Sequence, residues 1–394
     1  MADRPLSAAA ALVRACGGAG DFDGRAVRGP GIWWQGAIEW DGQGRPGPVV
    51  VHCGDVVIPV SWPNGGMVVG RRRPAGCRID DFVYTRTAAE PRPGKTSATA
   101  AETRWLLRFL LTWALRGGWL DAEKILGLIG ASFIPALLAH RPNGAFEGDT
   151  GCGKSSLFSI IQHMHGGAAT RSENTTEAAL RHALAKSTRA PLLILNEMEA
   201  VAGGGRTDGL VELLRHTYVR GEGGWSRAGA DATEGRPPDV AWMVGAIDLP
   251  PAKEEDANRR VPIHMGKLAD VKERTLIAYD RRAARAIALG PRLRRRVLEH
   301  LPRYRMVYRA YQAPMVQREL SPRTITTWCT VLALADILEH DPIPNSAADR
   351  AAILARATRW ADRLACQQMS VAAPARAPQA VLDRILSYSL SHIK

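Results

Sequence analysis

The sequence predicts an α/β protein with a parallel sheet built around a P-loop, a small β-rich module before it and a basic helical part after it. Three observations support this fold class. Residues 148–155 read G-D-T-G-C-G-K-S, short apolar strands alternate with helices from about 141 to 268, and the chain turns helical after 269. We divide the chain into a β-rich N-terminal module (1–95), a helical linker or collar (96–140), a P-loop core (141–270) and a basic helical C-terminal domain (271–394).

Composition excludes several classes of protein. A hydrophobic share of 46% with 23% charged residues excludes a largely disordered polyelectrolyte. The longest uncharged apolar run, Ile125–Ala139, is shorter than the roughly 18 residues that cross a bilayer, and we interpret it as a buried helix pair. The start of the chain has no secretory pattern, so we expect a cytoplasmic location without membrane contact. The six cysteines are scattered, so neither a zinc site nor a disulfide framework is expected.

The first 95 residues are assigned to a β-rich module because β-branched runs at Gly31–Trp34 and Pro48–Val60 are broken by Gly and Pro. A linker rich in Pro, Gly, Ser and Thr follows at about 88–101. Helical patterns then begin at Glu102–Leu115 and Asp121–Leu138. Apolar residues recur at helical spacing in the first pattern and are expected to be core positions: Trp105, Leu106, Phe109, Leu110 and Trp113.

The segment Gly148–Ser155 matches the P-loop pattern G-x-x-x-x-G-K-[S/T] at every fixed position. Its glycines let backbone amides face phosphate, Lys154 reaches the β and γ phosphates of ATP, and Ser155 places a hydroxyl on Mg²⁺. An amphipathic helix follows, while the preceding strand, Gly144–Glu147, is short and weakly apolar. The predicted nucleotide-binding residues are Gly148, Asp149, Thr150, Gly151, Cys152, Gly153, Lys154, Ser155 and Ser156.

The second nucleotide motif is expected where the buried strand Pro191–Leu195 ends, at Asn196 and Glu197. An Asp normally orients the Mg²⁺ shell there, and the next Glu positions or polarises the attacking water. Asn196 replaces that carboxylate with a neutral amide, so metal affinity is expected to be weakened. We assign Glu197 and Asn196 as catalytic candidates, and Ser155 and Asn196 as Mg²⁺ ligands, partly through water.

Two further positions on the core are candidates. Asp248 follows the strand Val240–Ile247, from which a polar side chain can sense the γ-phosphate, although a turn Asp before Pro250 explains it equally well. Arg260 lies just past the core strands, where an arginine often reaches a neighbouring subunit's nucleotide as an arginine finger. A structural salt bridge is an equal alternative for Arg260.

A nucleic-acid partner is favoured by two features. The Gly-rich segment 220–229 carries Arg220, Trp225 and Arg227, which combine stacking with phosphate contact as single-strand channels do, although a plain surface hairpin is nearly as good an explanation. From Val271 to Lys394 there are 21 Lys or Arg and 10 Asp or Glu, a net charge of +11 out of +13 for the chain. Basic surface attracts nucleic acid through counterion release. Solvated helix faces are the alternative for this second feature.

The order of these motifs resembles the ATPase part of prophage and mobile-element primase–helicase proteins, related to superfamily III helicases and the wider AAA+ group. The similar stretches cover about residues 25–340 and lie at Arg28–Trp34, Val51–Asp55, His140–Pro142, Thr175–Ala178, Asn196–Glu199, Leu213–Arg215 and Asn258–Val261. The family pattern has Asp at position 196, and a small polar residue or Asn rather than Asp248. No primase, zinc-binding or nuclease motif accompanies them, so a primase is expected to be a separate protein.

This resemblance implies an ASCE-type P-loop ATPase ring, commonly hexameric, that translocates on DNA with Mg²⁺ and ATP between subunits. It implies that Lys154 and Ser155 bind phosphate and Mg²⁺, that Glu197 activates water, and that Arg260 is the finger. The leading hypothesis is a DNA-translocating ATPase that acts on single-stranded or forked DNA without sequence preference, as a replicative helicase of a phage or mobile element. The alternative is a nucleotide-stabilised DNA-binding assembly, a loader or initiator, with slow or no hydrolysis. A regulatory or defence NTPase is a third possibility.

Overall fold

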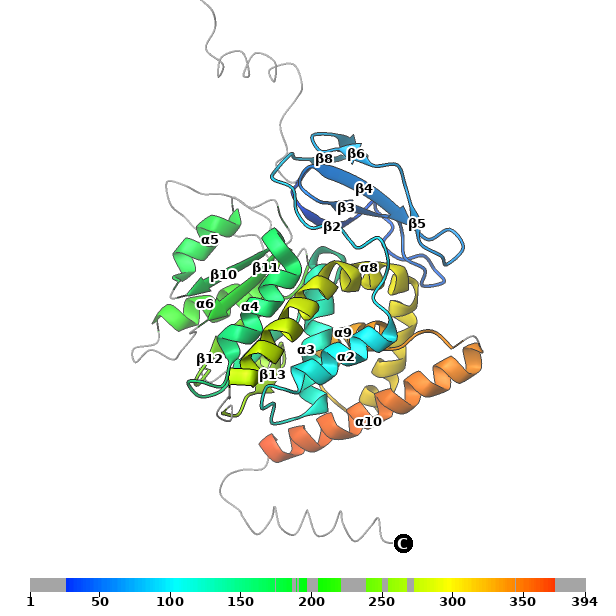
Figure 1. Ribbon diagram of the computed structural model, residues 1–394. Helices are drawn as coiled ribbons and strands as arrows, with labels where there is room; N and C mark the ends of the chain where they lie inside the picture. Colours follow the sequence, from blue (N-terminus) through cyan, green and yellow to red (C-terminus); the bar gives the residue numbers. More distant parts are fainter. Residues whose placement is uncertain are drawn as a thin grey trace, which may run out of the picture.

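The structure, a computed structural model, describes residues 26–173, 175–185, 189, 191–196, 205–220, 239–249, 254–267, 273–343 and 345–372. A β-rich module lies at one end of the molecule, a parallel sheet with its flanking helices forms the middle, and helix α10 (Ser346–Ala372) runs along the opposite end (Figure 1).

The N-terminal module consists of short strands in two sheets, which are antiparallel except for the parallel pair β1 and β8. One sheet has the order β2-β3-β4-β5 with β6 also paired to β4, and the other has the order β1-β8-β7. The two Trp side chains Trp34 and Trp62 tie the module to the helices, because their indole nitrogens donate to Leu137 O at 3.2 Å and to Leu298 O at 3.0 Å. The strands are β1 (Val27–Arg28), β2 (Gly31–Trp34), β3 (Val49–His52), β4 (Val56–Ser61), β5 (Val68–Val69), β6 (Arg73–Pro74), β7 (Arg78–Ile79) and β8 (Phe82–Tyr84).

The central sheet has five parallel strands in the order β10-β11-β12-β9-β13. Their bounds are β9 (Asn143–Glu147), β10 (Ala169–Glu173), β11 (Leu192–Asn196), β12 (Ala241–Ala246) and β13 (Arg260–His264). The strand before the P-loop, β9, is therefore separated from β11 by β12. The chain leaves β9 toward β10 on one side of the sheet and leaves β12 toward β13 on the other side. Ligands of open α/β sheets bind at the carboxyl ends of neighbouring strands whose connections run in opposite directions in this way.

Side chains on the two faces of the sheet belong to two different hydrophobic clusters. On β11, Leu192 and Ile194 join the larger cluster with α3 (Trp119–Phe133) and α4 (Lys154–His165), whereas Leu193 and Leu195 join a smaller cluster with α5 (Glu177–Ala185) and α6 (Gly205–His216). Helices thus cover both faces, as expected for a sheet whose strands are apolar on both sides. The short η3 (Gly166–Ala168) precedes β10, and the short α7 (Glu254–Ala257) precedes β13.

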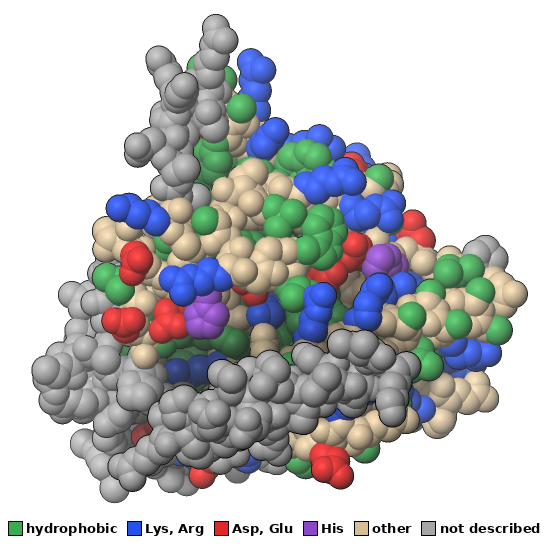
Figure 2. All heavy atoms as spheres, turned by 90° about the horizontal axis from the view of Figure 1, so that it is seen from below, with side chains coloured by type: hydrophobic (Ala, Val, Ile, Leu, Met, Phe, Trp, Pro, Cys, Tyr) green, Lys and Arg blue, Asp and Glu red, His purple; other side chains and the backbone are tan. Residues whose placement is uncertain are grey.

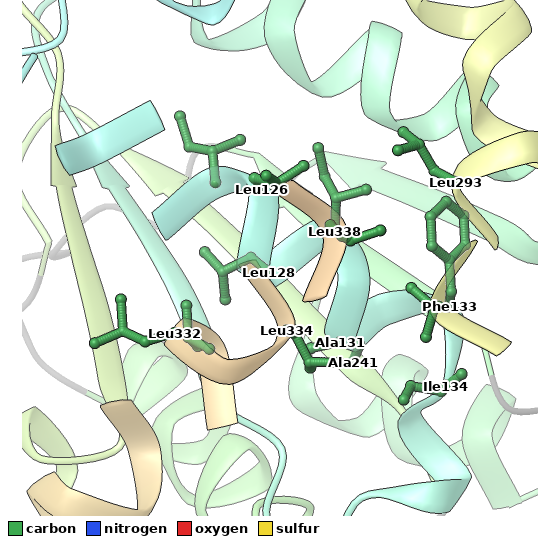
Figure 3. Packing of buried hydrophobic residues seen from close by; sticks show 14 of the residues in the cluster. Leu126, Leu128, Ala131, Phe133, Ile134, Ala241, Leu293, Leu332, Leu334 and Leu338 are labelled. Carbon is green, nitrogen blue, oxygen red and sulfur yellow. The ribbon is translucent and has the colours of Figure 1, made fainter. Parts of the chain in front are cut away.

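The helical part packs around α3. Helix α9 (Pro322–Glu339) lies along α3, and α8 (Glu273–Gln317) packs against both α4 and α9 (Figure 3). Leu126 and Leu128 of α3 and Leu334 and Leu338 of α9 belong to the labelled packing in that view. Helix α2 (Ala100–Leu110) and the turn η2 (Pro135–Leu137) complete this layer, and the cluster continues into the N-terminal module through Ile32 and Val49.

The fold class is confirmed: a parallel sheet with flanking helices follows a β-rich module and precedes a helical region. Helix α9 is capped by Ser321, which accepts a hydrogen bond from Thr324 N at 3.2 Å, and Pro322 begins the helix. Strands β10 and β13 were not predicted. Among the residues that the structure describes, no helix combines the length and apolar character needed to cross a membrane.

Candidate functional site

The P-loop connects the carboxyl end of β9 to the first turn of α4. Gly151 and Gly153 have φ angles of +83° and +84°, a left-handed conformation that favours glycine. Gly148 is required for a different reason, because a Cβ there would lie 2.4 Å from Met265 O. The loop borders an open cleft of about 260 Å³ that is lined by Asp149, Thr150, Gly151, Cys152, Gly153, Lys154, Ser155, Asn196, Ala246 and Ile247.

Lys154, Ser155 and Asn196 meet in this cleft. The side-chain amide of Asn196 donates to Ser155 Oγ over 3.3 Å, which joins the end of β11 to the first turn of α4. The Lys154 ammonium donates to Gly148 O and lies 3.6 Å from Cys152 Sγ. A Cβ at Gly245 of β12 would lie 2.6 Å from the Phe158 ring and 3.4 Å from Asn196 Oδ1, so this glycine leaves room for both. The two predicted nucleotide motifs therefore lie side by side.

The helical collar contacts the P-loop through Trp113. Its indole nitrogen donates to Gly153 O at 3.0 Å and lies 3.4 Å from Ser156 Oγ, which itself donates to Gly153 O at 2.8 Å. Trp113 is 2% exposed and packs edge-on against Phe109. Ser156 thus holds the start of α4 instead of lining the cleft. Sequence periodicity assigned Trp113 to the core but gave no signal for this contact, which joins residues 40 positions apart.

The short strand β9 is central to the sheet despite its weakly apolar sequence. A Cβ at Gly144 would lie 2.8 Å from Leu128 Cδ1, so the glycine lets α3 approach the strand closely. At the other end, Glu147 accepts a hydrogen bond from Leu249 N at 3.2 Å and lies 3.0 Å from His264 Nδ1. Asp248 is exposed beside this pair and is not one of the described residues that line the cleft. A role for Asp248 in sensing phosphate stays a prediction.

Arg260 begins β13, the strand beside β9, where it is paired with Asn143 at the amino ends of the strands, whereas the P-loop lies at their carboxyl ends. Burial lowers the pKa of its guanidinium. The neighbouring Arg259 donates to Asp256 Oδ1 at 3.1 Å, and Asp256 also accepts two hydrogen bonds from Arg215 at 2.9 and 2.7 Å. Arg260 therefore lies away from the cleft of its own chain.

The candidate DNA contacts are placed only in part. The Arg220 guanidinium is 14% exposed, pairs with Glu39 and donates to Ala136 O at 2.9 Å. These contacts give Arg220 a structural role between the core and the N-terminal module. Trp225 and Arg227, like the catalytic candidate Glu197, lie outside the described residues.

Part of the run of arginines in α8 is internal, which qualifies the basic surface inferred from the charge count. Arg294 and Arg296 are only 7% and 2% exposed. Arg296 donates to Leu338 O and Ala98 O at 2.7 and 3.0 Å, so it joins the linker to the end of α9. On the face of the molecule seen from below, Lys and Arg side chains are spread out with Asp and Glu among them (Figure 2). Counting charges along the sequence therefore overstates the basic surface.

The side chains around the cleft fit a magnesium ion that is held mainly by a nucleotide. Mg²⁺ in phosphate-transfer sites is usually bound by one or two protein groups together with phosphate oxygens, and not by a protein cage. Ser155 Oγ is the hydroxyl ligand available here, with Asn196 as its hydrogen-bond partner. No group of three or more His, Cys, Asp or Glu side chains in the described part of the chain is arranged to hold a metal by itself.

Comparison with known proteins gives distant structural likenesses. No protein-family model and no curated protein matches this chain. The apo C-terminal region of NrS-1 (305–718) is similar at 12% identity and a TM-score of 0.37, over 56% of this chain and 52% of that one. SCCmec type IV Cch, an active helicase, has 13% identity and a TM-score of 0.41, over 84% of this chain and 60% of that one. JCV helicase has 13% identity and a TM-score of 0.27, over 68% and 61%.

This chain thus spans about half of the NrS-1 region and about three fifths of the other two proteins. Because every one of these TM-scores is below 0.5, a function has to be argued from the residues of the site.

Proposed function

We propose that this protein is an ATP-dependent, DNA-translocating ring ATPase that acts as a replicative helicase of a phage or mobile element. The observation that carries the proposal is the meeting of a glycine-cradled P-loop with the end of β11, where Asn196 donates to Ser155 Oγ at 3.3 Å. Phosphoryl transfer is catalysed mostly by positioning and by charge stabilisation, which is what a loop of this kind provides.

Each group at the cleft has a role in this proposal. The backbone amides of Gly151–Ser155 and the Lys154 ammonium bind the phosphates of ATP, and Ser155 holds Mg²⁺. When bound, Mg²⁺ neutralises charge on the β and γ phosphates. Glu197 orients the attacking water. Because Arg260 lies at the amino ends of the strands, opposite the end that carries the P-loop, it reaches ATP only as a finger supplied to the next subunit, in a ring that is commonly hexameric.

The DNA-binding part of the proposal rests on the segment 221–238, between two anchored ends. Arg220 on one side pairs with Glu39, and Asp239 on the other pairs with the buried Arg141. Trp225 and Arg227 lie between these anchors and supply stacking and phosphate contact to single-stranded or forked DNA. Priming is left to a separate protein, and a cytoplasmic location is part of the same proposal.

Strand displacement tests this function. Purified protein is incubated with a forked duplex carrying a labelled strand, with Mg²⁺ and either ATP or a non-hydrolysable analogue, beside Lys154→Ala. The proposal predicts displacement by the wild type with ATP alone. Equal displacement by Lys154→Ala, or with the analogue, would show that the P-loop drives no movement on DNA.

A second candidate function is favoured by Asn196. With an amide in place of the usual carboxylate, ATP can serve mainly to hold subunits together in a DNA-binding loader or initiator. ATP-dependent assembly, measured by light scattering, without turnover of ATP would favour this alternative. Assembly accompanied by steady turnover that DNA stimulates would favour the helicase.

A further inference from the structure

The strand next to β11 carries a carboxylate beside Asn196. Strand β10 is in register with β11 so that Glu173 lies directly beside Asn196, and Arg171 lies beside Ile194. Parallel neighbours in register point to the same face of a sheet, and the strands are about 4.8 Å apart. Ile194 and Ala169 both belong to the cluster on the α4 face, so Arg171, Glu173 and Asn196 also face α4.

A chain of hydrogen bonds fixes this arrangement to the P-loop. The Arg171 guanidinium donates to Ser155 O at 3.2 Å and to Glu173 Oε1 at 2.7 Å. Asn196 donates to the hydroxyl of the same Ser155 at 3.3 Å. Ser155 is thus contacted from β10 through its carbonyl and from β11 through its side chain. Arg171 is 20% exposed, so its ion pair with Glu173 is partly shielded from water.

We propose that Glu173 supplies the carboxylate of the Mg²⁺ shell that Asn196 does not, and that Arg171 positions it. This inference rests on the proposed function, because it requires Mg²⁺–ATP at the P-loop. The Glu173 carboxylate is 56% exposed at the carboxyl edge of the sheet, where it is free to accept hydrogen bonds from metal-bound water. Arg171 holds it on the side of Ser155.

The chemistry favours a role in the outer shell of the metal. Mg²⁺ dehydrates reluctantly and keeps several water ligands, which are oriented by nearby carboxylates. Glu173 acts on those waters and not as a direct ligand, because β11 and β12 both lie between its strand and β9, the strand that leads into the P-loop. An edge-strand ion pair that only stabilises β10 would leave the metal dependence of ATP binding unchanged, which separates the two explanations.

The test measures the affinity for a non-hydrolysable ATP analogue with Mg²⁺ and again with EDTA, so it does not depend on turnover. The ratio of the two affinities is compared between the wild type and Glu173→Gln. We expect the ratio to fall roughly 10-fold or more in Glu173→Gln, in line with losses of roughly 10–100-fold for outer-shell partners. Glu212→Gln is the matched control, because Glu212 is 55% exposed and lies on α6 at the other face of the sheet.

A second variant sharpens the test. Adding Asn196→Asp to Glu173→Gln returns a carboxylate to the neighbouring register position, and we expect it to restore the Mg²⁺ dependence. An unchanged ratio in Glu173→Gln, or a wild type whose affinity ignores Mg²⁺, overturns the inference while ATP binding stands. If the wild type binds the analogue no better than Lys154→Ala, the proposed function fails and the inference fails with it.

Discussion

At the cleft, some residues contribute through their backbone conformation and others through their side chains. Gly151 and Gly153 supply the left-handed turns, with φ of +83° and +84°, so backbone amides are free to face an anion. Lys154 supplies the positive charge, and Ser155 supplies the hydroxyl that Asn196 contacts. The conformation of the loop therefore depends on positions where a Cβ is either strained or sterically excluded.

Trp113 is expected to position the loop without touching the nucleotide. Trp113→Phe keeps an aromatic ring in the core but removes the donor to Gly153 O, which leaves that carbonyl with a weaker set of partners. A lost neutral hydrogen bond costs about 1 kcal/mol, roughly a fivefold change in an equilibrium constant. We expect ATP affinity, measured by titration of a fluorescent analogue, to fall by that factor.

Trp105→Phe is the control for this prediction. Trp105 stacks on Phe109 in the same aromatic group, with ring centroids 5.7 Å apart, and is only half-buried. It should leave ATP affinity unchanged. Equal losses in the two variants would mean that aromatic packing, and not the bond to Gly153, sets the affinity.

Some helices and strands can be predicted from the local sequence, and others cannot. The P-loop, the strands β11 and β12 and the cap of α9 follow from local patterns, because each is a continuous apolar run or a motif of fixed spacing. Strand β10 reads Ala-Thr-Arg-Ser-Glu and lies at the edge of the sheet, so it has no apolar run to reveal it. The contacts of Trp113 and Arg171 with the P-loop join separate elements, and no local pattern encodes them.

The packing of α3 on α9 depends on Gly127. A Cβ at this position would lie 2.2 Å from Val331 O, so the two helix backbones approach too closely for any side chain. Gly127→Ala should therefore lower the free energy of unfolding by about 1–3 kcal/mol, measured by urea denaturation.

Gly130→Ala on the same helix is the comparison, because its Cβ would meet Leu338 Cδ1 at 3.0 Å and Leu334 Cβ at 3.2 Å, and one of these atoms ends a flexible side chain. It should cost less, since the Leu338 side chain can move aside whereas the Val331 carbonyl cannot, and the gain in helix propensity of about 1 kcal/mol from alanine applies to both variants. If Gly127→Ala is as stable as the wild type, the two helices are not packed this closely.

At the scale of the whole molecule, several arginines of α8 join segments that are distant in sequence. Arg292 pairs with Glu102 at 2.5 Å, and Arg303 contacts both carboxylate oxygens of Asp349 at 3.0 Å, so α8 is joined to α2 and α10. Part of the net charge of +13 therefore comes from arginines that make internal packing contacts. Sequence reasoning could not separate these arginines from a DNA-binding surface, because burial depends on the tertiary structure.

The position of Arg260 predicts that catalysis is shared between subunits. Arg260→Ala alone should bind ATP but lose turnover by roughly 10³-fold or more, as expected for an arginine finger. Lys154→Ala alone should bind no ATP. When the two variants are mixed, Lys154→Ala subunits offer an intact Arg260 to neighbours whose P-loops are intact, so the ATPase rate should rise several-fold above the sum of the separate rates. A mixture no faster than its parts would place the finger elsewhere or exclude a ring.

Steady-state ATP hydrolysis tests the central claim most directly. The rate is measured for the wild type, Lys154→Ala and Asn196→Asp, with Mg²⁺ and with or without single-stranded DNA. We predict that the wild type hydrolyses ATP, that DNA raises the rate, and that Lys154→Ala is inactive because the P-loop has lost its side-chain cation. A wild type that hydrolyses no ATP until Asn196 is replaced by Asp would contradict the motor and leave a protein that binds ATP for assembly.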